Sequence, residues 1–174
     1  MTNNHSSTNS ASFSAPPVSY TDRSDRAISI REYNEDYEEL VAMYEAFDSA
    51  DRAQGIPPAQ ERQIRRWLDS ITESGPDVVA LHDGQIIGHA TLVPDPESEA
   101  HELAIFVLSE YQGAGIGTKL LETLLGTGNE NDIAKVWLSV ERWNSPAIAI
   151  YEKAGFERIE GDSLELKMEL ELDG

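Results

Sequence analysis

The sequence predicts an α/β (α+β) domain in which helices pack on both faces of a mixed β-sheet. Short segments in which apolar and polar residues alternate have the period of a strand, and segments in which apolar residues recur every three or four positions have that of a helix. In chain order these segments give β-α-α-β-β-β-α-β-α-β-β. Hairpins combined with strand–helix–strand units favour a mixed sheet covered by helices.

The first half of this order begins with a strand at Ile28 and Ile30. Apolar residues on one face then predict two helices, and Asp83-Gly84 between two apolar runs is a strong hairpin signal. The helices are expected at residues 37–47 and 64–71, and the strands of the hairpin at 78–81 and 86–93.

The second half begins with a strand whose apolar residues alternate from Leu103 to Val107. A glycine turn and a leucine-faced helix follow, then a strand, a helix that ends at Gly155, and two last strands. These last four segments are expected at residues 136–140, 145–154, 156–159 and 163–172.

Length and composition fit one domain preceded by a tail. Residues 1–26 of the 174 are rich in Ser, Thr, Asn and Pro and almost without periodicity, which predicts a disordered N-terminal tail with no core residue. Residues 27–174 are expected to form a single domain. The tail lacks the apolar core of a secretory signal, and no apolar run approaches the roughly 20 residues of a membrane helix, so a cytoplasmic location is expected.

The chain is strongly acidic, with 32 Asp and Glu against 13 Lys and Arg and a formal net charge of −19. Nucleic acids and anionic membranes need a basic surface, so neither is an expected partner. Dispersed acid with few lysines resembles the proteins of salt-accumulating halophiles, and an ordinary acidic protein is the alternative. There are no cysteines, and the four histidines show no metal-ligand spacing, so no metal is expected.

The turn Gln112-Gly113-Ala114-Gly115-Ile116-Gly117 joins the central strand to its helix. The first N–H groups of a helix have no partner inside it and can bind an anion, and glycine lets the ligand approach the backbone. No Lys-Ser or Lys-Thr follows, which excludes the Walker pattern, and the spacing does not fit G-x-G-x-x-G. The turn therefore predicts a phosphate site of another kind.

The spacing Gln112-x-x-Gly115-x-Gly117 resembles the Q/R-x-x-G-x-G/A signature of the GNAT family of N-acetyltransferases. A second segment, a strand followed by Asn144, Tyr151 and Gly155-Phe156, resembles that family's N-x-x-A-x-x-x-Y-x-x-x-G-F. The match is nearest to the ribosomal-protein alanine acetyltransferase branch and covers about residues 28–172. The resemblance implies the GNAT fold and an acetyl-CoA-dependent N-acetyltransferase.

The resemblance also implies roles for individual residues. The glycine turn would hold the pyrophosphate of acetyl-CoA, and a backbone N–H near Val107 or Leu108, where the central strand opens at a bulge, would bind the thioester oxygen. Asn144 would either bond the pantetheine arm or only shape the start of its helix. The residues implied in holding the pyrophosphate are Gln112, Gly113, Ala114, Gly115, Ile116 and Gly117.

The catalytic assignments are Tyr151 and Glu102. Tyr151 matches the family's tyrosine acid, since a hydroxyl of pKa about 10 keeps its proton at neutral pH and can give it to the leaving sulfur; a packed helix tyrosine is the alternative. Glu102 would act as base directly or through water, with Glu141 as a second candidate and solvated carboxylates as the alternative. Ser139 stands where the alanine branch carries a glutamate, so that branch's substrate does not carry over.

The acceptor is a primary amine of open identity, either a small molecule or a protein N-terminus, and the protein is expected to be a monomer or a homodimer. Arg52 falls in the region that covers the acceptor side in the family. A second function class stays open because no base is unambiguous. In it, the chain is a non-catalytic acyl-CoA-binding or protein-interaction module of the same fold.

Overall fold

The computed structural model describes residues 13–48, 57–73 and 75–172, so the segment around Arg52 lies outside the described residues. The observed order of elements is the predicted one with a strand added at the start. The elements are β1 (Val18–Thr21), β2 (Ala27–Glu32), α1 (Tyr37–Glu45), α2 (Glu61–Thr72), β3 (Asp77–His82), β4 (Gln85–Pro94), β5 (His101–Val107), the short 3₁₀ turn η2 (Ser109–Tyr111), α3 (Ile116–Glu130), β6 (Lys135–Glu141), α4 (Ser145–Ala154), β7 (Glu157–Gly161) and β8 (Glu165–Glu171).

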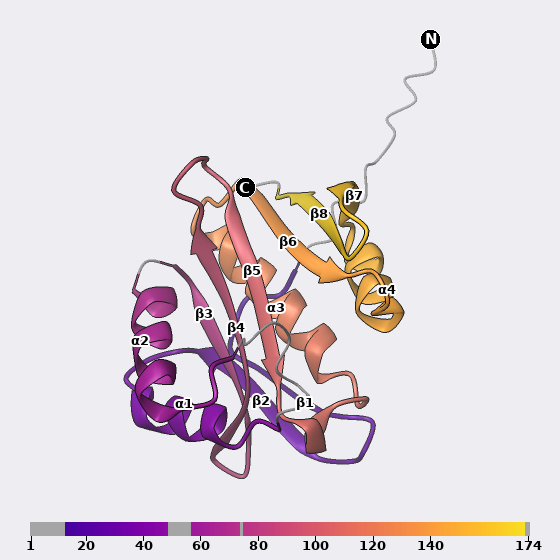
Figure 1. Ribbon diagram of the computed structural model, residues 1–174. Helices are drawn as coiled ribbons and strands as arrows, with labels where there is room; N and C mark the ends of the chain where they lie inside the picture. The colour runs from indigo at the N-terminus through magenta and orange to yellow at the C-terminus, as the bar shows by residue number, and fades with distance from the viewer. Residues whose placement is uncertain (1–12, 49–56, 74, 173–174) are drawn as a thin grey trace.

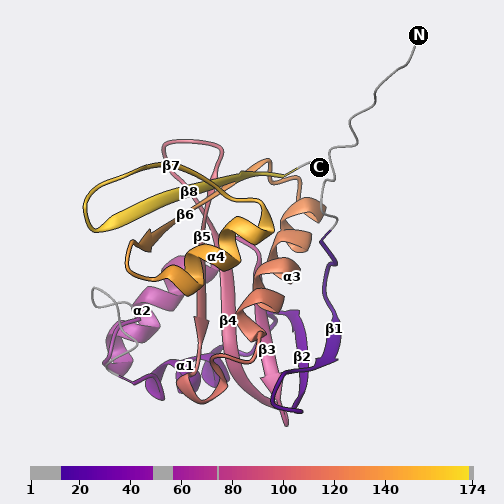
Figure 2. The ribbon, with the colours of Figure 1, turned by 90° about the vertical axis from the view of Figure 1, so that its right-hand side faces the viewer.

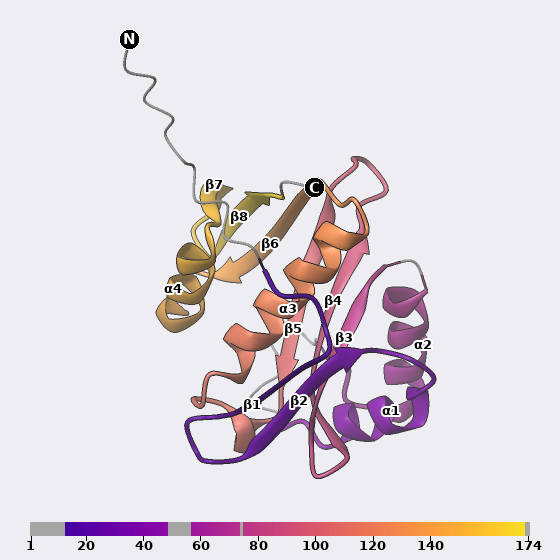
Figure 3. The same cartoon turned by 180° about the vertical axis from the view of Figure 1, so that it is seen from behind.

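The strands form one mixed sheet in the order β1-β2-β3-β4-β5-β6-β8-β7 (Figure 1). Every neighbouring pair is antiparallel except β5 and β6, which are parallel. Helices α1 and α2 cover one face, and α3 and α4 lie on the other (Figures 2 and 3). The predicted mixed sheet with helices on both faces is therefore confirmed. No helix within the described ranges is long and apolar enough to cross a membrane.

Two hydrophobic clusters fill the space on either side of the sheet. Because side chains alternate along a strand, Val78 and Ala80 belong to the cluster under α3, whereas Val79 belongs to the cluster under α1 and α2. The four leucines that predicted the face of α3 are all fully buried, namely Leu120, Leu121, Leu124 and Leu125. At Gly88 an added Cβ would lie 2.9 Å from the Leu120 Cδ1, so glycine lets α3 approach β4 closely.

The structure differs from the sequence prediction at the N-terminus, where residues 13–26 were placed in a disordered tail. Residues Val18–Thr21 form β1, which pairs antiparallel with β2. Phe13 and Tyr20 pack against the cluster under α3. An added Cβ at Gly126 would lie 2.8 Å from the backbone of Ser14, so the segment runs directly over α3. Backbone pairing with β2, which does not depend on apolar periodicity, accounts for the difference.

Removing residues 1–21 should therefore lower the Tm by roughly 5 °C. Loss of the partly buried Phe13 and Tyr20 costs about 2 kcal/mol at ordinary burial energies, and each kcal/mol shifts the Tm of a chain of this size by about 2–4 °C. Thermal unfolding followed by circular dichroism measures the change. Ser19→Ala, at an exposed position of β1, is the control and should leave the Tm within about 1 °C. An unchanged Tm in the truncated protein would contradict the packing of β1.

Candidate active site

The site begins where β5 and β6 separate. Their parallel pairing covers only two positions, His101 with Val136 and Glu102 with Trp137, and beyond these the strands spread apart (Figure 1). A cleft of about 720 Å³ opens there. Its lining comes from β5, β6, β8, α4, the end of η2 and the segment after α1, so residues far apart in the sequence meet in it.

The backbone of β5 presents the Val107 N–H to this cleft. The ladder between β4 and β5 is regular from Pro94–His101 to Gly88–Val107, so the expected bulge is absent and the divergence of β6 creates the opening. The Leu108 N–H donates to the Ile87 carbonyl at 3.0 Å, which removes it as a donor to a ligand. Successive N–H groups of a strand point to opposite sides, so that of Val107 points toward β6.

The glycine turn lies next to the cleft and leads into α3. Gln112 lines the cleft, and its Nε2 donates to the Val107 carbonyl at 3.0 Å, which fixes the turn to the end of β5. Gly113 and Gly115 have φ values of 78° and 90°, a left-handed conformation that favours glycine. Ile116 begins α3, whose first N–H groups have no partner within the helix.

The space over this turn is open at two of its three glycines. A Cβ built on Gly113 or Gly117 would meet no atom within 4 Å, so the turn is open on that side. Gly115 caps α3 without a side-chain hydrogen bond, which leaves the N-terminal N–H groups of the helix available. Open space, unpaired donors and the positive end of the helix dipole together make an anion site.

Helix α4 brings two of the predicted residues to the cleft. Asn144 caps α4, since its Oδ1 accepts the Ala147 N–H at 3.3 Å, so its role in shaping the helix start is real. Its side-chain NH₂ is a separate group that this cap does not use. Tyr151 lines the same cleft and packs edge-to-face against Phe156 with 5.8 Å between ring centroids. Burial raises the pKa of Tyr151 to about 12, so the hydroxyl is protonated at neutral pH.

Carboxylates collect on the sheet face of the cleft that α1 and α2 leave uncovered. Glu141 and Glu165 are paired across β6 and β8, and both line the cleft with Ser139. Glu102 lies on β5 outside that lining, beside Trp137. Partial burial and the charges of Asp95 and Glu165 raise the pKa of Glu102, and the Lys167 ammonium opposes them.

Several lining residues were missed by the sequence analysis. Phe47 and Phe106 form the aromatic floor, with ring centroids 6.3 Å apart, and Trp143 at the rim is 74% exposed. Glu165 could have been found, because the alternation in β8 turns its charged residues to the face opposite its apolar ones. The aromatic residues gave no such signal, since only the tertiary fold brings them to one place.

Comparison with known proteins identifies the family. The sequence profile described as "Acetyltransferase (GNAT) family" matches residues 30–156. The chain belongs to this family.

Individual relatives agree with this. An N-alpha-acetyltransferase of Saccharolobus solfataricus is 31% identical over 93 residues, 47% of this chain and 56% of that protein. The crystal structure of the ribosomal-protein-alanine N-acetyltransferase from Brucella melitensis is 27% identical, with a TM-score of 0.68 over 82% of this chain and 99% of that one. A GNAT phosphinothricin acetyltransferase from Sinorhizobium meliloti, solved in complex with acetyl-CoA, is 22% identical with a TM-score of 0.68 and coverage of 83% and 88%.

The chain spans about half the length of the first curated relatives it matches, 51% of a Mycobacterium tuberculosis protein and 56% of the Saccharolobus one. The structural matches extend over more of the chain, and that with the Sinorhizobium protein shows a shared fold. The predicted family and GNAT fold are confirmed by these findings together.

The charges around Glu102 make its pKa testable. Asp95→Asn should lower the Glu102 pKa, because it removes a negative charge that disfavours ionisation, and Lys167→Met should raise it. Carbon-detected NMR titration of the glutamate carboxyl groups measures both shifts. Asp83→Asn, in the exposed β3–β4 turn, is the control and should change nothing. Shifts of the same sign in the two variants would contradict the electrostatic account.

Proposed function

We propose that the protein transfers an acetyl group from acetyl-CoA to the nitrogen of a primary amine. The observation that carries this proposal is the open glycine turn at the start of α3, fixed by Gln112 to the same strand end whose Val107 N–H faces the cleft. Family membership and the acetyl-CoA in a protein of the same fold support the choice of co-substrate. In this proposal Gly113, Ala114, Gly115, Ile116 and Gly117 hold the pyrophosphate through backbone N–H groups.

The reaction that fits this arrangement is direct attack of the neutral amine on the thioester carbon. A C–N bond forms, the carbonyl oxygen gains negative charge, and the C–S bond then breaks to release the thiolate while the nitrogen loses a proton. The Val107 N–H supplies the fixed donor for the oxygen. One preorganised donor of this kind is worth roughly 3 kcal/mol in the transition state. The Leu108 N–H stays hydrogen-bonded to the Ile87 carbonyl, so Leu108 contributes only the packing of its side chain.

Tyr151 acts on the leaving sulfur by donating a hydrogen bond. A pKa of about 12 makes its tyrosinate more basic than a thiolate, whose conjugate acid has a pKa of about 8.5 in the cysteine reference. Complete transfer of the proton to sulfur is therefore uphill. A hydroxyl that stays protonated at every physiological pH still stabilises the charge that develops on sulfur.

The acceptor in this proposal is an amine that arrives as an ammonium and is deprotonated at the cleft. Glu141 and Glu165 line the cleft and attract the cation, and Glu102, with its raised pKa, takes the proton through water. An α-amino group of pKa about 7.7–8.0 is partly neutral already and needs little help. The N-alpha-acetyltransferase name of the Saccharolobus relative agrees with an acceptor of this class.

A second candidate function is a module that binds acyl-CoA or a protein without turnover. The observation in its favour is that Ser139, and not a carboxylate, stands at the centre of the cleft face of β6. Binding of acetyl-CoA is common to one form of this candidate and to the enzyme. A measurement of catalytic turnover therefore distinguishes the enzyme from the binding module.

Gly117→Glu tests whether the glycine turn binds phosphate. The substitution should keep or raise the stability of the protein and should weaken its binding of acetyl-CoA. Gly117 lies in the first turn of α3, and a Cβ there meets nothing within 4 Å. Glycine costs a helix about 0.8–1.0 kcal/mol relative to alanine, so the Tm should hold or rise. The new carboxylate opposes a phosphate, and the Kd for acetyl-CoA measured by calorimetry should increase at least about tenfold.

The control is Gln63→Glu, which adds the same charge at an exposed position of α2 and should leave the Kd unchanged. A folded Gly117→Glu protein that binds acetyl-CoA as tightly as the wild type would remove the turn from the proposal.

Tyr151→Phe tests the role of the hydroxyl. The kcat should fall roughly 10- to 100-fold, which corresponds to the loss of one hydrogen bond to a developing charge, about 1.5–3 kcal/mol, while the Kd for acetyl-CoA stays within about threefold because the ring still packs against Phe156. Release of free CoA thiol with peptides that carry a free α-amine measures the kcat. Tyr33→Phe, in a separate hollow of the protein, is the control. Undiminished turnover would show that the tyrosine is only a packed side chain.

A further inference from the structure

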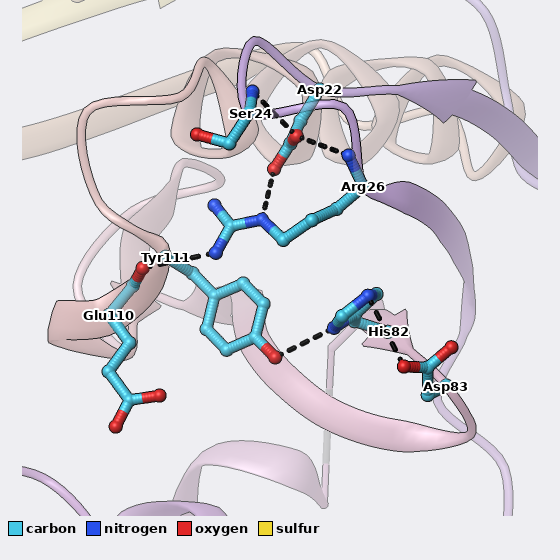
Figure 4. A network of polar contacts seen from close by, with 7 residues as sticks. All are labelled: Asp22, Ser24, Arg26, His82, Asp83, Glu110 and Tyr111. Carbon is cyan, nitrogen blue, oxygen red and sulfur yellow. Dashed lines mark hydrogen bonds and ion pairs between the residues drawn. The ribbon is translucent and has the colours of Figure 1, made fainter.

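The turn between β1 and β2, residues 22–26, is a built structure with a buried carboxylate at its centre (Figure 4). Asp22 is 5% exposed, and its Oδ1 accepts the backbone N–H groups of Ser24 and Arg26 at 2.9 Å each. Its Oδ2 accepts the Arg26 Nε at 2.8 Å. One carboxylate thus fixes the backbone of the turn and the guanidinium of Arg26 together.

This turn between β1 and β2 contacts both η2 and the glycine turn that follows it. Arg26 Nη1 donates to the Glu110 carbonyl at 3.1 Å, and the guanidinium lies 4.3 Å from the centre of the Tyr111 ring (Figure 4). The Tyr111 hydroxyl lies in turn 2.8 Å from the His82 Nδ1. The backbone N–H of Arg23 donates to the Ala114 carbonyl, inside the glycine turn, at 3.2 Å. The position of Arg23 is therefore set by backbone contacts and by its neighbours.

The side chain of Arg23 lies over the start of α3. Its Nε and Nη2 are 3.4 Å from the point where a Cβ on Gly115 would stand. Arg26, Arg31 and Arg65 each pair with a carboxylate, whereas within the described residues Arg23 has none at ion-pair distance. In a chain of net charge −19, an unpaired guanidinium beside the unpaired N–H groups of a helix is a second, independent feature that favours an anion.

The hollow that Arg23 lines is also locally basic, in contrast to the acidic chain as a whole. It has a volume of about 560 Å³ and lies between α3 and α4, with Lys119 and Lys153 in its lining. One carboxylate, Glu122, also lines it and lies 3.8 Å from the Lys119 ammonium. Phe13 and Val18 of the N-terminal segment form one wall. Three cations against one anion contrast with the acidic remainder of the chain.

We infer that Arg23 binds the pyrophosphate of acetyl-CoA, so that the N-terminal hairpin is part of the co-substrate site. This inference rests on the proposed function. A guanidinium presents a planar set of donors that matches phosphate oxygens and keeps its charge at all relevant pH values. The family profile matches residues 30–156, so Arg23 lies outside the matched segment. The absence of a side chain at Gly115 lets the guanidinium lie close to the backbone at the start of α3.

Calorimetric titration of Arg23→Gln with acetyl-CoA tests the inference. The Kd should increase about tenfold, which corresponds to the loss of one charge-assisted contact, while the Tm stays unchanged because the Arg23 backbone contact with Ala114 survives the substitution. Arg23→Lys should restore part of the affinity. Arg62→Gln, an exposed arginine of α2 on the other face of the sheet, is the control and should bind as the wild type does.

A second titration, with 3′-dephospho-CoA, identifies the phosphate. The ratio of the Arg23→Gln and wild-type Kd values should be the same as with acetyl-CoA, because both ligands carry the pyrophosphate. A ratio that falls to one would place Arg23 on the 3′-phosphate and overturn the inference. Equal affinity of Arg23→Gln and wild type for acetyl-CoA would also overturn it and leave the proposed function intact. Failure of the wild type to bind acetyl-CoA would overturn both.

Discussion

The parallel contact between β5 and β6 lasts for only two residue pairs, and the site depends on how it ends. Parallel strands need a crossover, here α3, which places a helix N-terminus directly after β5. Beyond Glu102 the backbone groups of β5 that face β6 lose their ladder partners. The Gln112 side chain satisfies the Val107 carbonyl, and the N–H of the same residue faces the cleft. One interruption of the sheet thus produces a cleft, a donor and an anchored turn.

In the proposed binding of acetyl-CoA, this acidic chain holds a polyanion and must do so through short-range contacts. With a net charge of −19, the mean field of the protein repels phosphate, and salt reduces that repulsion only beyond roughly one Debye length, about 8 Å at physiological ionic strength. Backbone N–H groups at the start of α3 and a guanidinium over Gly115 act at contact distance. This constraint explains why open glycines and one unpaired arginine matter more here than an overall basic patch would.

The sequence predicted those parts of the fold that depend on local pattern. The leucines of α3, the Asp83-Gly84 hairpin and the glycine turn are local signals, and each lies where expected. The strand β1 was missed because it is a segment of only four residues, ordered by its hairpin with β2 and by the contact of the preceding residues Ser14 and Ala15 with Gly126 of α3. Only the tertiary fold brings Phe47 and Phe106 together in the cleft, whereas the alternation in β8 could have indicated Glu165. The β4–β5 ladder shows no bulge, and the sheet opens instead where β6 diverges from β5.

In the proposed reaction, the residues of the cleft divide the chemical work according to their surroundings. Tyr151 is buried and its pKa is raised to about 12, so it holds a proton against the sulfur but yields it poorly. Glu141 and Glu165 stand on the face that α1 and α2 leave uncovered and attract the ammonium, and Glu102 takes its proton through water. Donation at the sulfur and acceptance at the nitrogen thus belong to opposite sides of the sheet. The gap between β5 and β6 is where both sides reach the same reacting carbon.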